Sequence, residues 1–314
     1  MHSNQKAVLI GMCGHSMQAY EILKSRTDIT VCGVASGSAH EQMTTSFDPT
    51  VPFFASYTEM LDTVKPTLAV VSPVFGLTGN VVMECAARGI DVFCEKPVAG
   101  TIEELDDVER AVKESGIRFC AMHYLRYAPA FWQGAQMVKN GAIGDVRLLS
   151  AQKSYRFGKR PEWFADRDLF TGIIPWVGIH AVDWIYTFSQ KRFLSANAQS
   201  YGNPEMVSSC RFEMEDGVTA VMTLDYYRPD TAPSHDDDRI RCVGTDGILE
   251  IRDGKIHLMN RDGVQVVEPD AAPELLTLFL NGDTPIAPDE IFYLTRVALL
   301  ARQSADTRAT VSIG

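Results

Sequence analysis

The sequence predicts an α/β protein in which a doubly wound parallel sheet precedes an α+β domain with a large, mostly antiparallel, open sheet. The chain has 314 residues, more than one ordinary core accommodates, so two domains are expected. Up to about residue 121, short apolar runs alternate with longer amphipathic segments. Beyond residue 122 the runs lengthen and alternate in polarity. We therefore divide the chain into residues 1–122 and 123–314.

Composition indicates a folded protein that does not bind nucleic acid. Hydrophobic residues make up 46% of the chain and charged residues 22%, which suits packed cores. The formal net charge of −11 would repel a phosphate backbone. The seven cysteines are scattered and never spaced C-x-x-C, so we expect reduced thiols and no metal site. The first apolar run has only four residues, so we expect no signal peptide, no membrane partner and a cytoplasmic location.

Five apolar runs in residues 1–122 are predicted to be buried parallel strands. They are Ala7–Ile10, Ile29–Ala35, Leu68–Val71, Asp91–Cys94 and Ile117–Ala121. The segments between them carry helix signals. Capping boxes begin at Ser56 and Thr101, and Gly89 and Gly116 stand where helices would end. Strands that alternate with helices predict βαβ units.

The remainder of the chain is predicted to form a meandering sheet between two helices. The helices are expected over Pro129–Lys139 and Pro288–Ser304. The strand-like runs are Val146–Tyr155, Val207–Glu213, Val218–Tyr227 and Ile240–Ile251. Asp-Gly pairs at 216–217, 246–247, 253–254 and 262–263 are typical of the turns of such a sheet. The acidic run His235–Asp238 is interpreted as an exposed loop rather than a metal site.

A glycine-containing turn follows the first predicted strand. The run Gly11–Ser16 aligns with the dinucleotide fingerprint G-x-G-x-x-G/A in a strand, turn and helix context, as in a Rossmann domain. Gly11 would allow the tight turn, and Cys13 replaces the glycine that approaches the pyrophosphate. We name Gly11, Cys13 and Gly14 as cofactor-binding residues. The alternative is ordinary punctuation between a strand and a helix.

The second predicted strand ends without the acidic residue that usually binds the ribose of NAD. Ser36-Gly37-Ser38 stands there, and no acid occurs between Val31 and His40. A 2′-phosphate would meet the hydroxyls of Ser36 and Ser38 rather than repulsion. NADP is therefore slightly favoured over NAD as the cofactor. The alternatives are that Ser36 starts a loop or that cofactor binding has been lost.

Three segments carry a resemblance to a known family. They are Glu95-Lys96-Pro97, Met122–Tyr127 and Gly178–Asp183. With the order of the domains, they resemble the glucose-fructose oxidoreductase/inositol dehydrogenase/MocA family (Gfo/Idh/MocA). The resemblance implies hydride transfer between NAD(P) and a hydroxyl-bearing or carbonyl carbon of a sugar, polyol or related cyclic compound. It also implies a homodimer or homotetramer, paired through the open sheet.

By this resemblance Lys96 is a catalytic, substrate-binding and cofactor-binding residue. An ammonium at a strand end would polarise a carbonyl or stabilise a developing alkoxide. The family also implies a cis bond between Lys96 and Pro97, and a place for Glu95 and Pro73 at the cofactor. The alternative for Lys96 is a surface lysine paired with Glu95.

His180 matches the histidine of the D-x-G-x-H stretch of the family and is predicted to be the general acid and base, in contact with substrate. The aspartate of that stretch is replaced by Trp176, which we expect to stack against the substrate. Asp183 lies three residues after His180, on the same face of a helix, and is predicted to support its imidazole. The alternative is a structural His180–Asp183 pair.

Further site residues are expected around these. Arg126 matches an arginine that lies near the cofactor in the family. Tyr155 and Trp163 bound a basic, aromatic stretch that would bind an anionic or cyclic substrate, with a solvated face as the alternative. Two other functions stay open: a ligand-sensing protein without turnover, and an NAD-dependent enzyme that cleaves glycosidic bonds.

Overall fold

The computed structural model describes residues 5–41 and 48–314 and divides into two compact units. The N-terminal unit comprises the chain up to Met122 together with Asp166–Thr171 and Leu275–Thr295. The C-terminal unit comprises His123–Ala165, Gly172–Glu274 and Arg296–Gly314.

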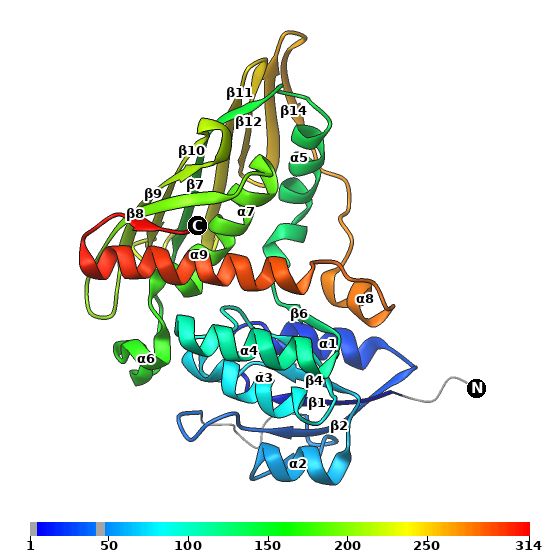
Figure 1. Cartoon of the computed structure of the whole chain (residues 1–314). Coiled ribbons are helices and arrows are strands. Elements are labelled where there is room, and N and C mark those ends of the chain that lie inside the picture. Colours follow the sequence, from blue (N-terminus) through cyan, green and yellow to red (C-terminus); the bar gives the residue numbers. More distant parts are fainter. Residues whose placement is uncertain (1–4, 42–47) are drawn as a thin grey trace. The chain divides into compact units, whose positions relative to one another are not determined.

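The N-terminal unit is built on a parallel sheet that, among the described residues, has six strands in the order β3-β2-β1-β4-β5-β6 (Figure 1). The strands are β1 (Gln5–Ile10), β2 (Ile29–Ala35), β3 (Phe53–Phe54), β4 (Leu68–Val71), β5 (Asp91–Cys94) and β6 (Phe119–Ala121). All five predicted strands are present, and β3 is an addition. The strand order reverses between β1 and β4, and ligands of such sheets bind beyond the carboxyl ends of the strands at that point.

The helices of this unit connect its strands or come from later parts of the chain. They are α1 (Ser16–Ser25), α2 (Tyr57–Val64), α3 (Thr78–Ala86), α4 (Ile102–Ser115), α6 (Arg167–Phe170), α8 (Leu275–Leu280), the turn η1 (Phe75–Leu77) and the first part of α9 (Pro288–Thr307). The side chains of Ser56 and Thr101 accept hydrogen bonds from the third residue of α2 and α4. Gly116 ends α4 with a φ of 67°.

Late segments of the chain complete the core of this unit. Phe292 stacks on Phe119 of β6 with ring centroids 5.3 Å apart. Phe279 of α8 lies 5.7 Å from Phe93 of β5. These aromatic contacts explain why residues 275–295 belong to a unit formed mostly by the first part of the chain.

The C-terminal unit is built on a mixed sheet whose described strands number nine, in the order β14-β13-β12-β11-β7-β10-β9-β8-β15. They are β7 (Val146–Tyr155), β8 (Phe193–Tyr201), β9 (Val207–Met214), β10 (Thr219–Asp225), β11 (Asp236–Gly244), β12 (Gly247–Arg252), β13 (Lys255–Asn260), β14 (Gly263–Val267) and β15 (Val311–Ser312). Only β7 and β10 pair in parallel among these strands. The fold class expected from the sequence is thus confirmed.

Two local expectations need correction. The run Ile240–Ile251 is two strands, because the Asp246-Gly247 pair turns the chain between β11 and β12. The prediction of an exposed loop at His235–Asp238 is wrong, since β11 begins at Asp236 and Asp238 is partly buried. The reason is an ion pair: Asp238 lies 2.8 Å from the ammonium of Lys153 on the neighbouring strand.

Helices cover one face of this sheet. They are α5 (Pro129–Lys139), α7 (Ile179–Ser189), the second part of α9, and the short turns η2 (Tyr124–Tyr127), η3 (Glu162–Ala165) and η4 (Ile174–Gly178). On β7 the side chains of Leu149, Ala151 and Lys153 are buried, while the alternate residues Leu148 and Ser150 are exposed. Period-two burial of this kind is that of a sheet covered on one side.

One helical stretch among the described residues, Arg167–Ser189, has the length and apolar composition that would cross a membrane. Its most apolar window is 83% buried inside the protein. Core helices of proteins without a membrane meet the same two criteria.

Candidate functional site

The glycine turn after β1 leaves no room for a side chain. Gly11 has a φ of +79°, and a Cβ there would lie 2.4 Å from the carbonyl oxygen of Ser72 and 2.5 Å from Pro73. The N–H of Cys13 donates to that same oxygen at 2.9 Å. The turn after β1 therefore packs against the loop after β4. This arrangement contains four of the predicted cofactor residues, Gly11, Cys13, Gly14 and Pro73.

Cys13 is not a reactive thiol. Burial, aided by the charges of Glu41 and Glu95, raises the pKa of Cys13 far above its ordinary value. A thiol that stays protonated is a poor nucleophile and a poor metal ligand. Its role is therefore to shape the turn.

Gly11→Ala is expected to cost about 2–4 kcal/mol of unfolding free energy, because it combines a positive φ with a clash against backbone atoms. It should also abolish saturable NADH binding. Gly89→Ala is the matched control, since Gly89 has a similar φ of +67° but nothing within 4 Å of the added Cβ. Its cost should be only about 1–2 kcal/mol, with NADH binding retained. Urea unfolding and nicotinamide fluorescence measure the two effects. Equal costs for the two variants would contradict the close packing at Gly11.

Glu95 holds the beginning of α1. Its carboxylate is fully buried and accepts hydrogen bonds from the backbone N–H of His15 at 2.8 Å and of Lys96 at 3.1 Å. The ring Nδ1 of His15 lies 2.9 Å from the same carboxylate. Burial opposes ionisation, but His15 and Lys96 lower the pKa of Glu95 below its ordinary value. Glu95, which the sequence analysis expects at the cofactor, is thus an anion whose hydrogen bonds connect β5 to the glycine turn.

Lys96 is buried at the carboxyl end of β5, with 2% of its surface exposed. Its Nζ lies 3.7 Å from Glu95 Oε1, and its bond to Pro97 is cis, as the family resemblance implies. The alternative of a surface lysine is wrong, although the pairing with Glu95 exists. A buried ammonium beside a buried carboxylate is common at catalytic centres.

Glu41 was missed by the sequence reasoning. Its carboxylate accepts hydrogen bonds from the backbone N–H groups of Gly37 and Val74, at 3.2 and 3.0 Å, and from the hydroxyl of Ser38 at 3.2 Å. A further bond comes from the backbone of Met12 in the glycine turn, and burial raises the pKa of Glu41. Glu41 stands one residue beyond the acid-free window that favoured NADP. Through these bonds its carboxylate contacts the loop that contains Ser36 and Ser38.

His180 lies in the first turn of α7 and is 3% exposed. The expectation that Asp183 supports it is not met. The carboxylate of Asp183 instead lies 3.1 Å from Nδ1 of His123 and accepts a hydrogen bond from Nε of Arg126 at 2.8 Å. Both partners come from the segment around η2. His180 and Asp183 are spaced to share one face of α7. The carboxylate nevertheless binds His123 and Arg126, which come from another element.

The group formed by Asp183, Arg126 and His123 is a buried charge cluster. Asp183 and His123 are fully buried, and Arg126 is 8% exposed. Burial opposes the ionised carboxylate, yet Arg126 and His123 lower the pKa of Asp183 to about 2. Arg126, expected at the cofactor, therefore has a structural partner within the C-terminal unit. The rings of His123 and His180 are 6.3 Å apart and nearly perpendicular.

Trp176 lies in the turn η4, which has π-helical hydrogen bonding and leads directly into α7. Such turns are frequent at functional sites. The N–H of Ile173 at its start donates to Glu205 at 2.8 Å. A Cβ on Gly178 would lie 2.7 Å from Leu224, so the turn packs closely against β10. Trp176 itself is partly exposed, as a substrate-stacking residue requires.

Tyr155 and Trp163 lie among aromatic and charged side chains. Lys153, fully buried and paired with Asp238, lies 4.8 Å from the ring centroid of Tyr155. Burial raises the pKa of the Tyr155 hydroxyl well above its ordinary value. The ring of Trp163 lies 4.5 Å from that of Phe164. Both residues predicted to bind substrate are thus in the C-terminal unit with His180.

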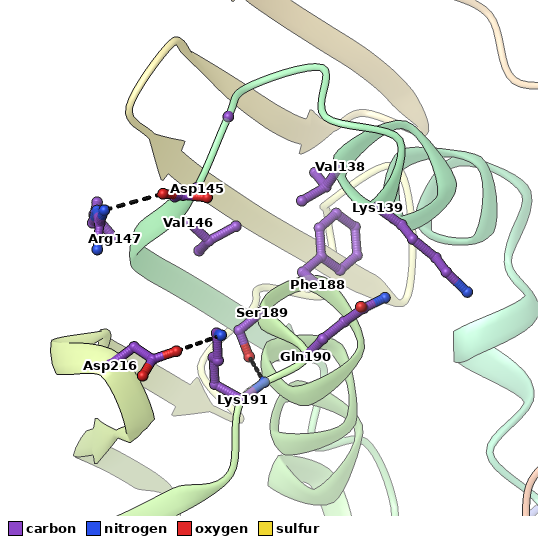
Figure 2. Close-up of a pocket in the computed structure, with 11 residues that line it drawn as sticks. Val138, Lys139, Asp145, Val146, Arg147, Phe188, Ser189, Gln190, Lys191 and Asp216 are labelled. Atoms are coloured by element: carbon purple, nitrogen blue, oxygen red, sulfur yellow. Dashed lines mark hydrogen bonds and ion pairs between the residues drawn. The ribbon is translucent and has the colours of Figure 1, made fainter.

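A pocket of about 500 Å³ lies elsewhere in the same unit, at the C-terminal ends of α5 and α7 (Figure 2). Four of its five charged residues pair with one another, Lys191 with Asp216 at 2.5 Å and Arg147 with Asp145 at 3.3 Å. None of the predicted site residues lines it. Among residues 5–41 and 48–314, no group of three or more His, Cys, Asp or Glu side chains is arranged to hold a metal ion.

Comparison with known proteins defines the class. Residues 6–123 match the model of an oxidoreductase family with an NAD-binding Rossmann fold, and residues 131–250 match the C-terminal domain of the same family. The chain belongs to the Gfo/Idh/MocA family of oxidoreductases. Its N-terminal unit is therefore a Rossmann domain of the NAD(P)-binding type.

Individual relatives agree with this class. A solved structure from Thermotoga maritima, assigned to the oxidoreductases, is 34% identical with a TM-score of 0.93, and the match covers 98% of this chain and 99% of that one. An inositol 2-dehydrogenase/D-chiro-inositol 3-dehydrogenase of Lactiplantibacillus plantarum is 23% identical over 72% of this chain and 65% of its own. An NADP⁺-dependent scyllo-inositol 2-dehydrogenase of Bacillus subtilis is 25% identical over 42% of this chain and 38% of its own. The chain thus spans less than two thirds of the length of these curated relatives.

Proposed function

We propose that the protein transfers a hydride between a nicotinamide cofactor and the hydroxyl-bearing or carbonyl carbon of a sugar, polyol or related cyclic alcohol. The observation that carries the proposal is the burial of Lys96 at the end of β5, tied through Glu95 to the glycine turn. The names of the two inositol dehydrogenases support the substrate class.

The N-terminal unit suits a dinucleotide. The N–H groups of Met12, Gly37 and Val74 all donate to the one carboxylate of Glu41, so backbone donors converge beside the glycine turn. Gly11 allows the tight turn that joins β1 to α1 there. When bound, the cofactor supplies or accepts the hydride at its nicotinamide ring.

The protein side chains supply the remaining chemistry. The ammonium of Lys96 stabilises negative charge on the substrate oxygen. The imidazole of His180 removes or returns the hydroxyl proton. The indole of Trp176 stacks against the substrate ring, in place of the carboxylate that the family has at that position.

A direct test is to incubate the protein with NAD⁺ or NADP⁺ and a panel of inositols, aldoses and alditols, and to follow absorbance at the nicotinamide band. Stoichiometric reduction supports the proposal. Saturable cofactor and ligand binding without reduction favours the ligand-sensing alternative. Cleavage of a glycoside with no net redox change favours the glycosidic alternative.

We further propose NAD as the preferred cofactor, in place of the NADP that the acid-free window favoured. A 2′-phosphate placed at Ser38 would lie beside the carboxylate of Glu41, and like charges at such separations repel. A ribose hydroxyl would instead donate to that carboxylate.

The protein is accordingly expected to bind NADH at least about 10-fold more tightly than NADPH near pH 7.5. Glu41→Ser should remove most of that difference, whereas Glu21→Ser, on the exposed side of α1, should leave it unchanged. Because burial raises the pKa of Glu41, the preference should weaken as the pH falls and the carboxylate takes up a proton. Fluorescence titration of both nucleotides measures the ratio, and tighter binding of NADPH to the unmodified protein would contradict the assignment.

Assembly and location are proposals as well. Large apolar side chains of the C-terminal sheet are exposed, among them Leu148 (40%), Leu194 (43%) and Met259 (52%). They support a homodimer or homotetramer paired through the open sheet face. All seven cysteines, each of them described, are free thiols, which suits the cytoplasm. Sedimentation of a monomer at micromolar concentration would contradict the assembly.

A further inference from the structure

The guanidinium group of Arg160 lies among aromatic rings and has no anionic partner among the described residues. It lies 5.1 Å from the ring centroid of Phe164, 5.7 Å from Tyr226 and 5.9 Å from Phe157. Aromatic faces attract a cation but do not neutralise it. Its Nη2 makes one long hydrogen bond, 3.5 Å to the carbonyl oxygen of Arg156. Its Nε is buried without a hydrogen-bond partner in the part of the chain that the structure describes.

Arg156, whose carbonyl oxygen accepts that bond, shares one feature with Arg160. Its Nη2 donates to the carbonyl oxygen of Ala232, and its Nε is likewise buried with no partner among the described residues. The hydroxyl of Tyr226, a residue 3% exposed, is a third buried polar group that lacks one there. Both arginines also lower the pKa of His235. We call Arg156, Arg160, Phe157, Phe164 and Tyr226 the arginine cage.

Three of the acids near the cage are engaged elsewhere. Asp238 is held by Lys153, and Asp237 is held by Arg228 and Arg239. Glu205, whose charge adds to burial in raising the pKa of Tyr226, accepts a hydrogen bond from the N–H of Ile173. Within residues 5–41 and 48–314 neither Arg156 nor Arg160 has an acidic oxygen within 4.0 Å. The chain has 40 acidic residues against 29 basic ones, so unpaired arginines are not explained by a shortage of acids.

A guanidinium group without an anionic partner in such surroundings lowers the stability of the fold unless a bound anion neutralises it. Two guanidinium forks and a phenol hydroxyl supply the donors that an oxyanion requires, and arginine binds carboxylates and phosphates through paired parallel bonds. The cage therefore has the chemistry of an oxyanion site rather than that of a site for neutral hydroxyl groups.

The cage lies next to the segment that carries the proposed catalytic residues. Tyr226 directly follows β10, whose Leu224 packs against the Gly178 position two residues before His180. The backbone N–H of Tyr226 donates to Met206, the neighbour of the Glu205 that binds the start of η4. A ligand held by the cage therefore lies along the elements that position Trp176 and His180.

We infer that the arginine cage binds a carboxylate of the substrate, so that the enzyme acts on an acidic sugar or sugar-derived acid in preference to a neutral one. This inference rests on the proposed function for its reaction, but the binding step is testable without turnover. A phosphate group has the same recognition chemistry, and the experiment separates the two sources.

The full-length protein is titrated with glucuronate, glucose 6-phosphate and glucose, following tryptophan fluorescence, because the ring of Trp163 lies 4.5 Å from that of Phe164 of the cage. Glucuronate is expected to bind at least about 10-fold more tightly than glucose. Arg160→Met and Arg156→Met should each remove about 10-fold or more of that preference. Arg239→Met, an arginine paired with Asp237 outside the cage, is the control and should retain the preference.

The outcomes are distinct. Preference for glucose 6-phosphate over glucuronate would overturn the carboxylate assignment, and equal binding of all three sugars would overturn the cage as an anion site. Loss of preference in Arg239→Met as well would assign it to general charge rather than to the cage. Arg160→Lys keeps the charge and should restore part of the preference if Arg160→Met has merely folded poorly. Absence of NAD⁺ reduction with every sugar, while glucuronate binding persists, would reject the proposed function and leave the cage in place.

Discussion

Replacing Lys96 by methionine is expected to lower kcat/KM for the oxidation of the preferred alcohol by about 10²–10³-fold. The ammonium is buried at the end of β5, and in the proposed reaction it stabilises the substrate oxygen that gains negative charge. Removing one preorganised stabiliser of such a charge typically costs a factor of that size. NADH affinity should change much less, since the glycine turn and Glu41 are intact.

Steady-state kinetics and NADH titration separate the two effects. Lys113→Met is the matched control, because Lys113 lies on α4 of the same unit and pairs at the surface with Glu109. It should retain full activity. The thermal midpoint of each variant establishes that it has folded. If Lys96→Met kept more than about a third of the activity, the catalytic assignment would be wrong.

Replacing Asp183 by alanine is expected to destabilise the protein by about 3–5 kcal/mol. The substitution would leave Arg126 and His123 buried without the carboxylate that both contact. Breaking a buried ion pair on one side carries a cost of that order. Asp216→Ala is the control, since its pair with Lys191 is largely exposed and such pairs contribute little to stability. Urea unfolding at neutral pH compares them, and similar losses would contradict the central place of Asp183.

The carboxylate of Asp183 should also affect how the unfolding free energy depends on pH in acid. Its pKa is lowered from 3.8 to about 2 in the folded protein, so its contribution is present above the unfolded pKa and is lost as the pH falls from about 4 to 2. The unfolding free energy of the unmodified protein should therefore fall more steeply across this interval than that of Asp183→Ala. Parallel curves would mean that Asp183 is not held as an anion.

Much of the fold follows from local patterns. The runs Ala7–Ile10 and Leu68–Val71 are buried at every position, as their unbroken hydrophobicity predicts for strands covered on both faces. The caps at Ser56 and Thr101 and the stop at Gly116 act within one helical turn, so neighbouring residues suffice to predict them. The tripeptide Glu95-Lys96-Pro97 likewise pointed to the family because it is contiguous.

The partners of the charged side chains were decided by tertiary structure. Asp183 shares a helix face with His180 but binds His123 and Arg126, and Glu41 binds a loop that the sequence appeared to leave without an acid. Glu95 joins a residue 80 positions earlier in the chain, and Arg160 lies among rings from two segments. Hydrophobic periodicity depends on each element's own residues, and the sequence therefore contains it. A buried charge takes whichever donors the packing of distant elements brings within about 3 Å, and no local pattern contains that information.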